Sequence, residues 1–457
     1  VNSHQMKTCK CDLTYVTFLV LGICSLLSYF ALMSTISYWK LMYDAIFVTI
    51  ISVLFCFSLL CGTVVLIKFN TRFKPEKIIT PALCGCFLSL IMIVLMYFIP
   101  VYAVRYYLTL LPVAICGFAS GIYFGSIGAC AARISPLMYQ ATSMGLTVSA
   151  LFIQIVKDIL HAFFQVPPTA PNYQMDQFYT IVLFFGIAVV YIIISIVVWE
   201  AKRAKLVGMG PNETVLVDVE ANAQTEPQTE PQTQSQEQEQ VSSVNTLSAV
   251  PANKPDSVLV SAKVESESES TKSEQNQRKS KERSKLQIFK VVLPSVASQF
   301  IQYFSTYFCY PSLITTTYLH ELAGKITMGW WALVIMTIFF FFNALGSVLP
   351  RFQTIYKRVS KTAVLWLGYV RLVFIPLYLL LTLPKGTPII RSDAASIIIG
   401  TFFGFSNGFV STFLFMKYQE DLSKVERVTG SFFIALSYQI AQVIGSLCGV
   451  GLATVVK

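Results

Sequence analysis

The chain has 457 residues, of which 54% are hydrophobic and only 13% are charged. Soluble domains carry about 25% charged residues, so this share is about half the usual one. A soluble protein of this length cannot bury so much apolar surface. Composition therefore excludes soluble, collagen-like, coiled-coil, disulfide-scaffold and wholly disordered proteins, and it indicates an integral membrane protein.

Eleven apolar stretches reach the length of about 20 residues that a membrane-spanning helix needs. They lie at residues 13–37, 45–68, 79–103, 106–132, 135–160, 178–200, 288–318, 327–350, 362–384, 394–417 and 428–456. The expected fold is therefore all-α and polytopic, with eleven transmembrane helices in a 6+5 arrangement. A short segment, 1–12, precedes an N-terminal lobe of six spans (13–200), and the C-terminal lobe of five spans covers 287–457.

The segment 201–286 between the lobes differs in composition. It repeats Thr-Glu-Pro-Gln from residue 225 and alternates Gln with Glu at 236–240 and Glu with Ser at 265–269. Such polar sequence cannot offset the entropy cost of ordering, so we expect a disordered loop. This loop could also bind regulatory partners.

Lys and Arg indicate the orientation of the spans. The segments that would share a side with the N-terminus hold twice as many of these residues as the opposite segments. Because cytoplasmic loops are enriched in Lys and Arg, we expect a cytoplasmic N-terminus and 201–286 loop and an extracellular or luminal C-terminus. The expected location is the plasma membrane. The net charge of +10 has the same origin, and no aromatic–basic pattern predicts a nucleic-acid surface.

Ionisable residues inside the spans are few, and each is a functional candidate because a charge in the bilayer is costly. Arg371 in the ninth span is the clearest; it could equally brace its lobe by pairing with backbone carbonyls. No Asp or Glu lies well inside a span, and Asp158, near the outer end of the fifth, comes closest. The lack of intramembrane carboxylates favours uncoupled, facilitated transport.

Signatures of catalysis and of cofactor binding are missing from the sequence. No Gly-rich phosphate loop is present, and most of the 11 cysteines lie singly in apolar runs. The three histidines are far apart: His4, His161 and His320. We therefore expect no enzymatic activity, no cofactor and no metal site.

Small residues recur at four-residue spacing in two spans. The fourth has Gly117, Gly121, Gly125 and Ala129, and the tenth has Gly400, Gly404 and Gly408. Such a helix face lets two backbones approach closely. Static packing is the simpler interpretation, although a moving interface between the lobes would use the same surface.

Two motifs carry a resemblance to a known family. Residues 403–408 read Phe-Gly-Phe-Ser-Asn-Gly and resemble a signature of the equilibrative nucleoside transporter family, and residues 371–376, Arg-Leu-Val-Phe-Ile-Pro, resemble a second one. Thr429-Gly-Ser-Phe at the start of the last span is also similar. The resemblance implies a shortened major-facilitator-like fold and facilitative transport of nucleosides or nucleobases, including purines, by alternating access.

The resemblance also implies a set of substrate-binding residues. Tyr29 stands where the family usually has Trp and would stack on the base, and its serine-rich surroundings fit a flat heterocycle. Ser120 would contact the base edge, and Met33 joins the same set. Asn343 and Ser347 stand where the family has Asp and Arg and would contact the sugar. The residues expected to have structural or gating roles are Arg371, Pro376, Ser406, Asn407 and Gly408.

The exchange of a charged pair for Asn343 and Ser347 has a consequence for specificity. A charge-assisted hydrogen bond contributes about 1.5–3 kcal/mol and a neutral one about 1 kcal/mol. We therefore expect weaker binding of ribose and a shift toward nucleobases. Two alternatives stay open: a proton-coupled or repurposed carrier of another small polar solute, and a membrane sensor or scaffold that transports nothing.

Overall fold

The computed structural model describes residues 3–43, 45–69, 74–163, 172–208, 283–384 and 388–455. The chain divides into two compact units, one formed by 1–211 with 287–457 and the other by 212–286. Residues 201–208 are the end of one helix, and another helix begins at Lys285. The segment between these helices is therefore shorter at both ends than the predicted loop, 201–286. Its remainder, 209–282, lies outside the described residues, and its disorder stays a prediction.

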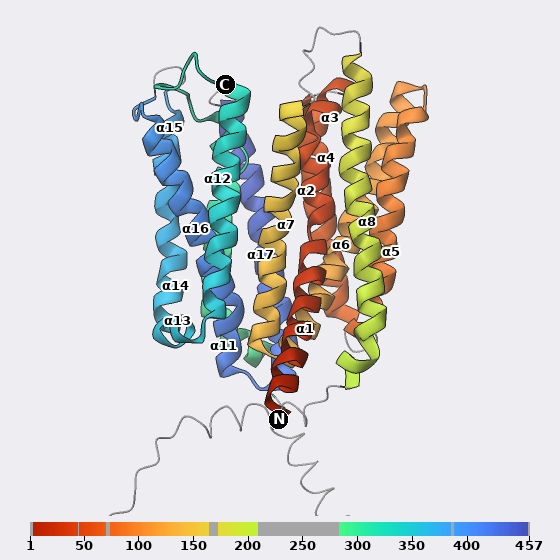
Figure 1. The fold of residues 1–457 in the computed structure, drawn as a ribbon, viewed down its shortest axis with the longest axis vertical. Helices are drawn as coiled ribbons and strands as arrows, with labels where there is room; N and C mark the ends of the chain where they lie inside the picture. Colours follow the sequence, from red (N-terminus) through yellow and green to blue (C-terminus); the bar gives the residue numbers. More distant parts are fainter. Residues whose placement is uncertain are drawn as a thin grey trace, which may run out of the picture. The chain divides into compact units, whose positions relative to one another are not determined.

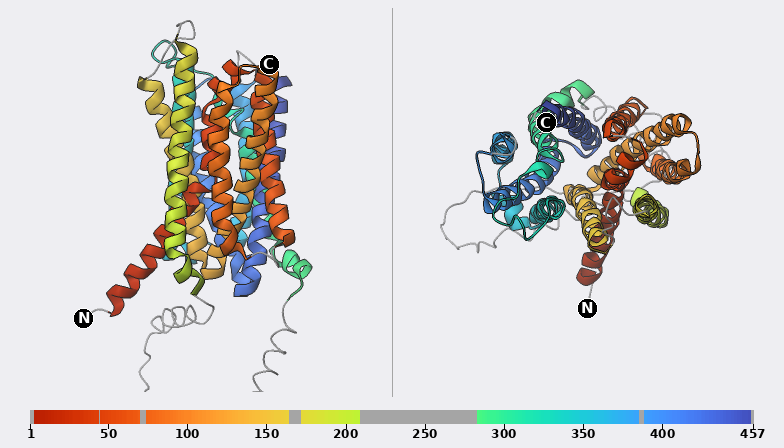
Figure 2. Two further views of the ribbon diagram at one scale, coloured as in Figure 1. Left: turned by 90° about the vertical axis from the view of Figure 1, so that its right-hand side faces the viewer. Right: turned by 90° about the horizontal axis from the view of Figure 1, so that it is seen from above.

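The described part of the first unit is helical, with one isolated bridge between Ala323 and Ile326. The N-terminal lobe contains α1 (Ser3–Cys24), α2 (Leu27–Ser34), α3 (Ile36–Met42), α4 (Ala45–Phe69), α5 (Pro75–Leu95), α6 (Tyr102–Ile134), α7 (Pro136–Phe163) and α8 (Tyr173–Gly208). The C-terminal lobe contains α11 (Lys285–Cys309), α12 (Met328–Val348), α13 (Gln353–Arg358), α14 (Lys361–Val370), α15 (Phe374–Thr382), α16 (Asp393–Lys417) and α17 (Lys424–Val455). The helices of the two lobes stand side by side (Figures 1 and 2).

Ten described helical segments are long and apolar enough to cross a membrane. The all-helical membrane fold is thus confirmed, and the predicted eleven spans are close to this number. The seventh expected span, α11, falls short in hydropathy although its 25 residues reach about 37 Å. The reason is its polar buried face, which comprises Ser295, Ser298, Gln299, Gln302, Ser305 and Thr306.

Two prolines set local boundaries in the C-terminal lobe. Helix α11 ends at Cys309, not at the predicted residue 318, because Pro311 cannot continue the hydrogen-bond pattern. The ninth span is split by the 3₁₀ turn η4 (Arg371–Val373) between α14 and α15. Pro376 lacks the N–H that a continuous helix would bond to the carbonyl of Leu372, which explains the break.

Close glycine contacts hold helices together inside each lobe. A Cβ added to Gly121 of α6 would lie 2.0 Å from the carbonyl oxygen of Leu59 in α4. A Cβ added to Gly408 of α16 would lie 1.8 Å from the carbonyl oxygen of Asn343 in α12. Since real carbon atoms cannot approach so closely, only glycine fits these positions. The stripes therefore serve mainly static packing within a lobe.

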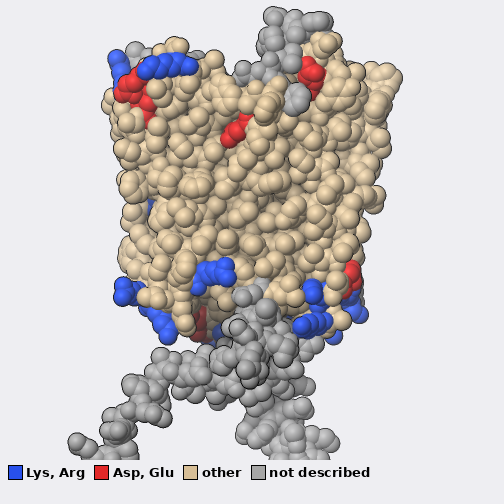
Figure 3. Space-filling view, in the orientation of Figure 1, with Lys and Arg blue, Asp and Glu red and all other residues tan. Residues whose placement is uncertain are grey.

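Charged side chains lie mostly at the two ends of the helical unit. In the orientation of Figure 1, Figure 3 shows a broad, mostly uncharged belt between these ends, with Lys and Arg at both ends and most of them at the end that carries the N-terminus. This end is called the N-face below, and the opposite end the C-face. An uncharged belt is the surface that a bilayer requires of an integral membrane protein.

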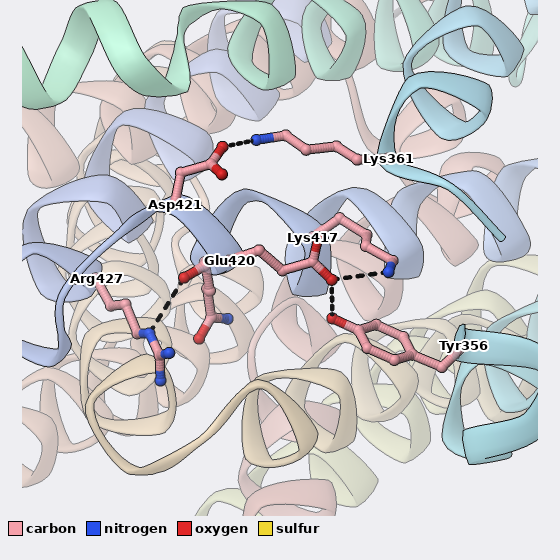
Figure 4. Close-up of polar contacts among 7 residues, drawn as sticks. Tyr356, Lys361, Lys417, Glu420, Asp421 and Arg427 are labelled. Atoms are coloured by element: carbon pink, nitrogen blue, oxygen red, sulfur yellow. Dashed lines mark hydrogen bonds and ion pairs between the residues drawn. The ribbon is translucent and has the colours of Figure 1, made fainter. Parts of the chain in front are cut away.

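A polar cluster ties helices together at the N-face of the C-terminal lobe (Figure 4). The Tyr356 hydroxyl donates to Glu420 at 2.8 Å, and the Lys417 ammonium lies 2.7 Å from the same carboxylate. Lys361 pairs with Asp421. Burial, followed by the adjacent Glu420 carboxylate, raises the pKa of the Tyr356 phenol, because both disfavour the phenolate. These contacts link α13 and α14 to the 3₁₀ turn η5 (Tyr418–Asp421) that follows α16.

Candidate functional site

A cavity of about 40 Å³ lies between the lobes. The residues that line it are Phe30, Leu146, Thr147, Ala150, Tyr303, Thr306, Tyr307, Tyr310, Phe339, Phe340, Asn343, Asn407 and Tyr438. They come from α2 and α7 of one lobe and from α11, α12, α16 and α17 of the other, with Tyr310 directly after α11. None of these lining residues is charged, and seven of them are aromatic.

One wall of the cavity consists of tyrosines. Tyr303 and Tyr307 follow one another by one turn of α11, and Tyr438 of α17 packs against both. The rings of Tyr303 and Tyr438 meet edge to face at a centroid distance of 4.4 Å. The hydroxyl groups of Tyr307 and Tyr438 are 2.7 Å apart and share a hydrogen bond. Tyr438 also contacts Phe124 of the N-terminal lobe at 5.4 Å.

The polar lining residues Thr306 and Asn407 both contact Arg371, which is only 2% exposed. Its guanidinium donates to the carbonyl of Phe403 at 2.9 Å and to the hydroxyls of Ser406 and, at 2.9 Å, Thr306. It also reaches Asn407 Oδ1 at 3.3 Å and lies 4.8 Å from the Phe403 ring centroid. These contacts join η4 to α16 and α11; a structural or gating role for Arg371 stays a prediction.

The two asparagines of the site face each other where α12 and α16 touch. Asn407 Nδ2 donates to Asn343 Oδ1 at 3.0 Å. Gly408 allows this contact, because a side chain there would separate the two helices. Asn343 and Asn407 are each 5% exposed, and both line the cavity. The expected bracing residue Asn407 therefore also belongs to the cavity wall.

Helix α7 bonds to the C-terminal lobe along the N-face side of the cavity. Thr147 Oγ1 and Ser347 Oγ are 2.8 Å apart, and Gln140 Nε2 donates to the Ser347 carbonyl at 3.0 Å. One turn of α7 closer to the start of that helix, the hydroxyls of Ser143 and Thr412 are 3.2 Å apart. These polar contacts close the cavity toward the N-face.

The same helix closes the cavity toward the C-face. Asp158 accepts hydrogen bonds from Gln154, at 2.8 Å, and from Thr337 of α12. His161 packs edge to face on Trp330 at 4.9 Å. A cavity of about 40 Å³ holds roughly three water molecules, whereas ligand pockets span about 300 Å³ or more. A ligand can therefore enter only when the lobes separate at one face.

The structure brings some of the predicted site residues together. Asn343 lines the cavity, and Ser347 contacts the lining residue Thr147. Tyr29, Met33 and Ser120 are not among the lining residues. Tyr29 is buried against Phe30, at 5.7 Å, and against Phe55 of α4, at 5.3 Å, and Ser120 lies 3.4 Å from Cys86 of α5. Met33 packs on the same apolar core. Contact of these three with a substrate stays a prediction.

The tyrosines and Thr306 of α11 were missed by reasoning from the sequence. Their signal was nevertheless present, because Gln299, Tyr303 and Tyr307 recur at four-residue spacing, as do Gln302 and Thr306. In a helix, such spacing places residues on one face. A polar and aromatic face on a membrane span indicates a helix that lines a site or a water-filled path.

Solved structures of other proteins share this architecture. The structure resembles the major facilitator superfamily proton:xylose symporter XylE, with a TM-score of 0.62 and 10% identity, over 95% of this chain and 87% of the symporter. It also resembles a bacterial homologue of the iron transporter ferroportin, with a TM-score of 0.55 and 11% identity over 97% and 98% of the two chains. At such low identity these likenesses show the fold alone.

The family follows from sequence. A profile described as nucleoside transporter matches residues 110–453, well over half of the chain. The chain belongs to the nucleoside transporter family. Equilibrative nucleoside transporter 4 of Homo sapiens is 26% identical over 157 residues, which are 34% of this chain and 28% of that relative. The match thus spans less than a third of the relative's length. The family match and the helical membrane fold are consistent with each other.

Proposed function

We propose that this nucleoside transporter family member carries nucleosides, nucleobases or both down their concentration gradients by alternating access. The observation that carries the proposal is the cavity between the lobes, which combines seven aromatic rings with the amides of Asn343 and Asn407 and contains no charged lining residue. Stacking on an aromatic side chain stabilises a bound base by about 1–3 kcal/mol. A neutral flat heterocycle is the solute that such a cavity fits best.

In the orientation proposed from the distribution of Lys and Arg, the protein lies in the plasma membrane. Its N-face is then toward the cytoplasm and its C-face toward the outside of the cell. The N-face contacts of Ser143, Thr147 and Ser347 then form the inner gate. The outer gate contains Asp158 and Thr337. Each gate opens while the other stays closed, so the substrate crosses without a continuous pore.

The experiment that tests this function is uptake of labelled adenosine and hypoxanthine by cells that lack their own carriers, with excess unlabelled competitors. We expect saturable uptake of at least one, unchanged by a protonophore. Collapse with the protonophore would instead support a proton-coupled carrier. Deletion of residues 210–280 distinguishes a transporter from a membrane sensor or scaffold. A transporter should keep its flux without this segment, whereas a scaffold should lose its role. Surface protein without uptake would contradict the proposal.

Asn343→Ala and Ser347→Ala should both lower nucleoside uptake at normal surface expression. Asn343→Ala removes an amide from the cavity wall, and Ser347→Ala removes the hydroxyl that meets Thr147 across the lobes. The loss of one neutral hydrogen bond of about 1 kcal/mol lowers uptake about fivefold. Initial rates normalised to surface protein measure the effect, and wild-type uptake in both variants would remove these residues from the site.

A further inference from the structure

The hydrogen bonds around Arg371 fix which atoms of the two asparagines face each other. A guanidinium has five N–H donors and no acceptor, so the Asn407 atom beside it must be the carbonyl oxygen, Oδ1. The Nδ2 group of Asn407 then points to Asn343, and because Nδ2 only donates, it must meet Asn343 Oδ1. Arg371 therefore fixes the orientation of the Asn407 side-chain amide, and Asn407 in turn fixes the orientation of the Asn343 amide.

Neighbouring side chains reinforce this arrangement. Gln302 Nε2 donates to the Asn407 backbone carbonyl at 3.1 Å and lies 3.4 Å from Asn407 Oδ1. The Thr306 hydroxyl is 2.8 Å from the same oxygen. Rotating the Asn407 side-chain amide by half a turn would place its N–H₂ group against the guanidinium of Arg371 and so lose the contacts that Arg371 and Gln302 make with Oδ1. The Asn407 orientation is thus held by several donors at once.

The relay ends at a donor, Asn343 Nδ2, for which the described residues provide no acceptor. Asn343 Oδ1 is occupied by Asn407, and no described residue accepts a hydrogen bond from Asn343 Nδ2. Because Asn343 lines the cavity, its N–H₂ group is the polar group that it can offer to a ligand. An amide donor gains most from a carbonyl oxygen or an unprotonated ring nitrogen.

A second donor lies on the tyrosine wall. The hydroxyls of Tyr307 and Tyr438 carry two protons, and one of them makes the hydrogen bond between the two oxygens. No acceptor for the other proton is found among the residues that the structure describes. An unmade hydrogen bond in a buried site costs free energy, so a ligand that supplies an acceptor is favoured here as well.

We propose that Arg371 acts as a positioning residue which, through Asn407, makes Asn343 a hydrogen-bond donor, so that the site selects acceptor atoms on the purine or pyrimidine ring of its substrate. This inference rests on the proposed function. It states which atoms Asn343 reads: acceptor atoms of the base, namely its ring nitrogens and carbonyl oxygens, in preference to the oxygen of a sugar hydroxyl, which both donates and accepts.

The test is competition against labelled adenosine uptake by analogues that lose one group at a time. The 1-, 3- and 7-deaza adenosines each replace one ring acceptor with C–H, and 2′- and 3′-fluoro analogues replace a sugar hydroxyl and so remove its donor. In the wild type, we expect one deaza analogue to compete about fivefold less well than adenosine. In Asn343→Ala this difference should disappear, because the donor that reads the acceptor is gone.

Asn407→Asp tests the relay without changing Asn343. A carboxylate accepts from Arg371 and has no N–H to donate, so Asn343 should turn its own N–H₂ toward the new carboxylate and its oxygen toward the cavity. The same deaza analogue should then compete as well as adenosine or better. Asn172→Asp, the same change at an exposed position, is the matched control and should keep the wild-type pattern. Because each ratio is measured within one variant, a lower amount of folded protein does not alter it.

Two results would overturn the inference. In the first, all deaza analogues compete with the wild type as well as adenosine does, while a fluoro analogue competes less well and this difference is absent in Asn343→Ala. Asn343 would then contact the sugar and not an acceptor atom of the base. The other is an Asn407→Asp variant with the wild-type pattern, which would mean that Arg371 does not set the polarity. Absence of any adenosine or nucleobase uptake by the wild type would instead contradict the proposed function, so the two failures are distinguishable.

Discussion

Replacing Gly408 with alanine should abolish transport and lower the unfolding temperature more than any other single methyl group added to the C-terminal lobe. The new Cβ would lie 1.8 Å from the carbonyl oxygen of Asn343 and 2.9 Å from the backbone nitrogen of Ser347. Both atoms belong to the backbone, so no side-chain rotation relieves the clash, and α16 must move away from α12. Overpacking typically costs about 1–3 kcal/mol, and this clash lies at the upper end.

The same helix offers a matched control for this substitution. A Cβ at Gly400 would meet nothing closer than the Tyr378 hydroxyl at 3.8 Å, which is an ordinary contact. Gly400→Ala should therefore keep full uptake and gain up to about 1 kcal/mol from helix propensity. Thermal unfolding in detergent, with uptake at matched surface expression, measures both variants. Equal stability of the two variants would show that α12 and α16 do not touch as described.

Arg371→Lys should reduce transport at least tenfold although it keeps the positive charge. The guanidinium reaches the Phe403 carbonyl and the Thr306 hydroxyl at the same time, and a single ammonium cannot reproduce this fork. Hydrogen bonds to a charged group contribute about 1.5–3 kcal/mol each, so the loss of one or two accounts for the effect. Uptake and thermal unfolding should fall together.

The control for Arg371 is an exposed arginine of the same lobe. Arg358 in α13 is exposed, and Arg358→Lys should leave uptake and unfolding temperature unchanged. Because lysine is also a donor, Arg371→Lys should keep the preference among the deaza analogues even as the rate falls. A wild-type rate in Arg371→Lys would show that charge alone, and not the fork, is what the site requires.

Much of the fold could be predicted from the sequence because bilayer thickness sets helix length. The apolar runs located most spans to within a few residues. Where the structure differs from the prediction, the reason is a proline or a polar helix face. Pro311 ends α11 nine residues before the expected boundary, and the polar buried face of α11 lowers the mean hydropathy of that helix.

The site was harder to predict because helix periodicity shows which residues share a face but not where that face points. Tyr29 follows the break between α1 and α2, and its ring turns toward Phe55 while Phe30 lines the cavity. Ser120 lies on a face of α6 that packs on Cys86. The polarity of Asn343 depends on Arg371 through Asn407, and a relay among three helical segments has no local sequence pattern.

The central claim, that the lobes must separate on the N-face side of the cavity for a substrate to pass, is tested most directly by joining them covalently. The hydroxyls of Ser143 and Thr412 are 3.2 Å apart on opposite lobes, so cysteines at both positions should form a disulfide under mild oxidation. We expect adenosine and hypoxanthine uptake to stop in the oxidised double variant and to return with a reductant. Uptake by each single variant should be the same before and after oxidation. Full uptake by protein shown to be cross-linked would contradict alternating access through this cavity.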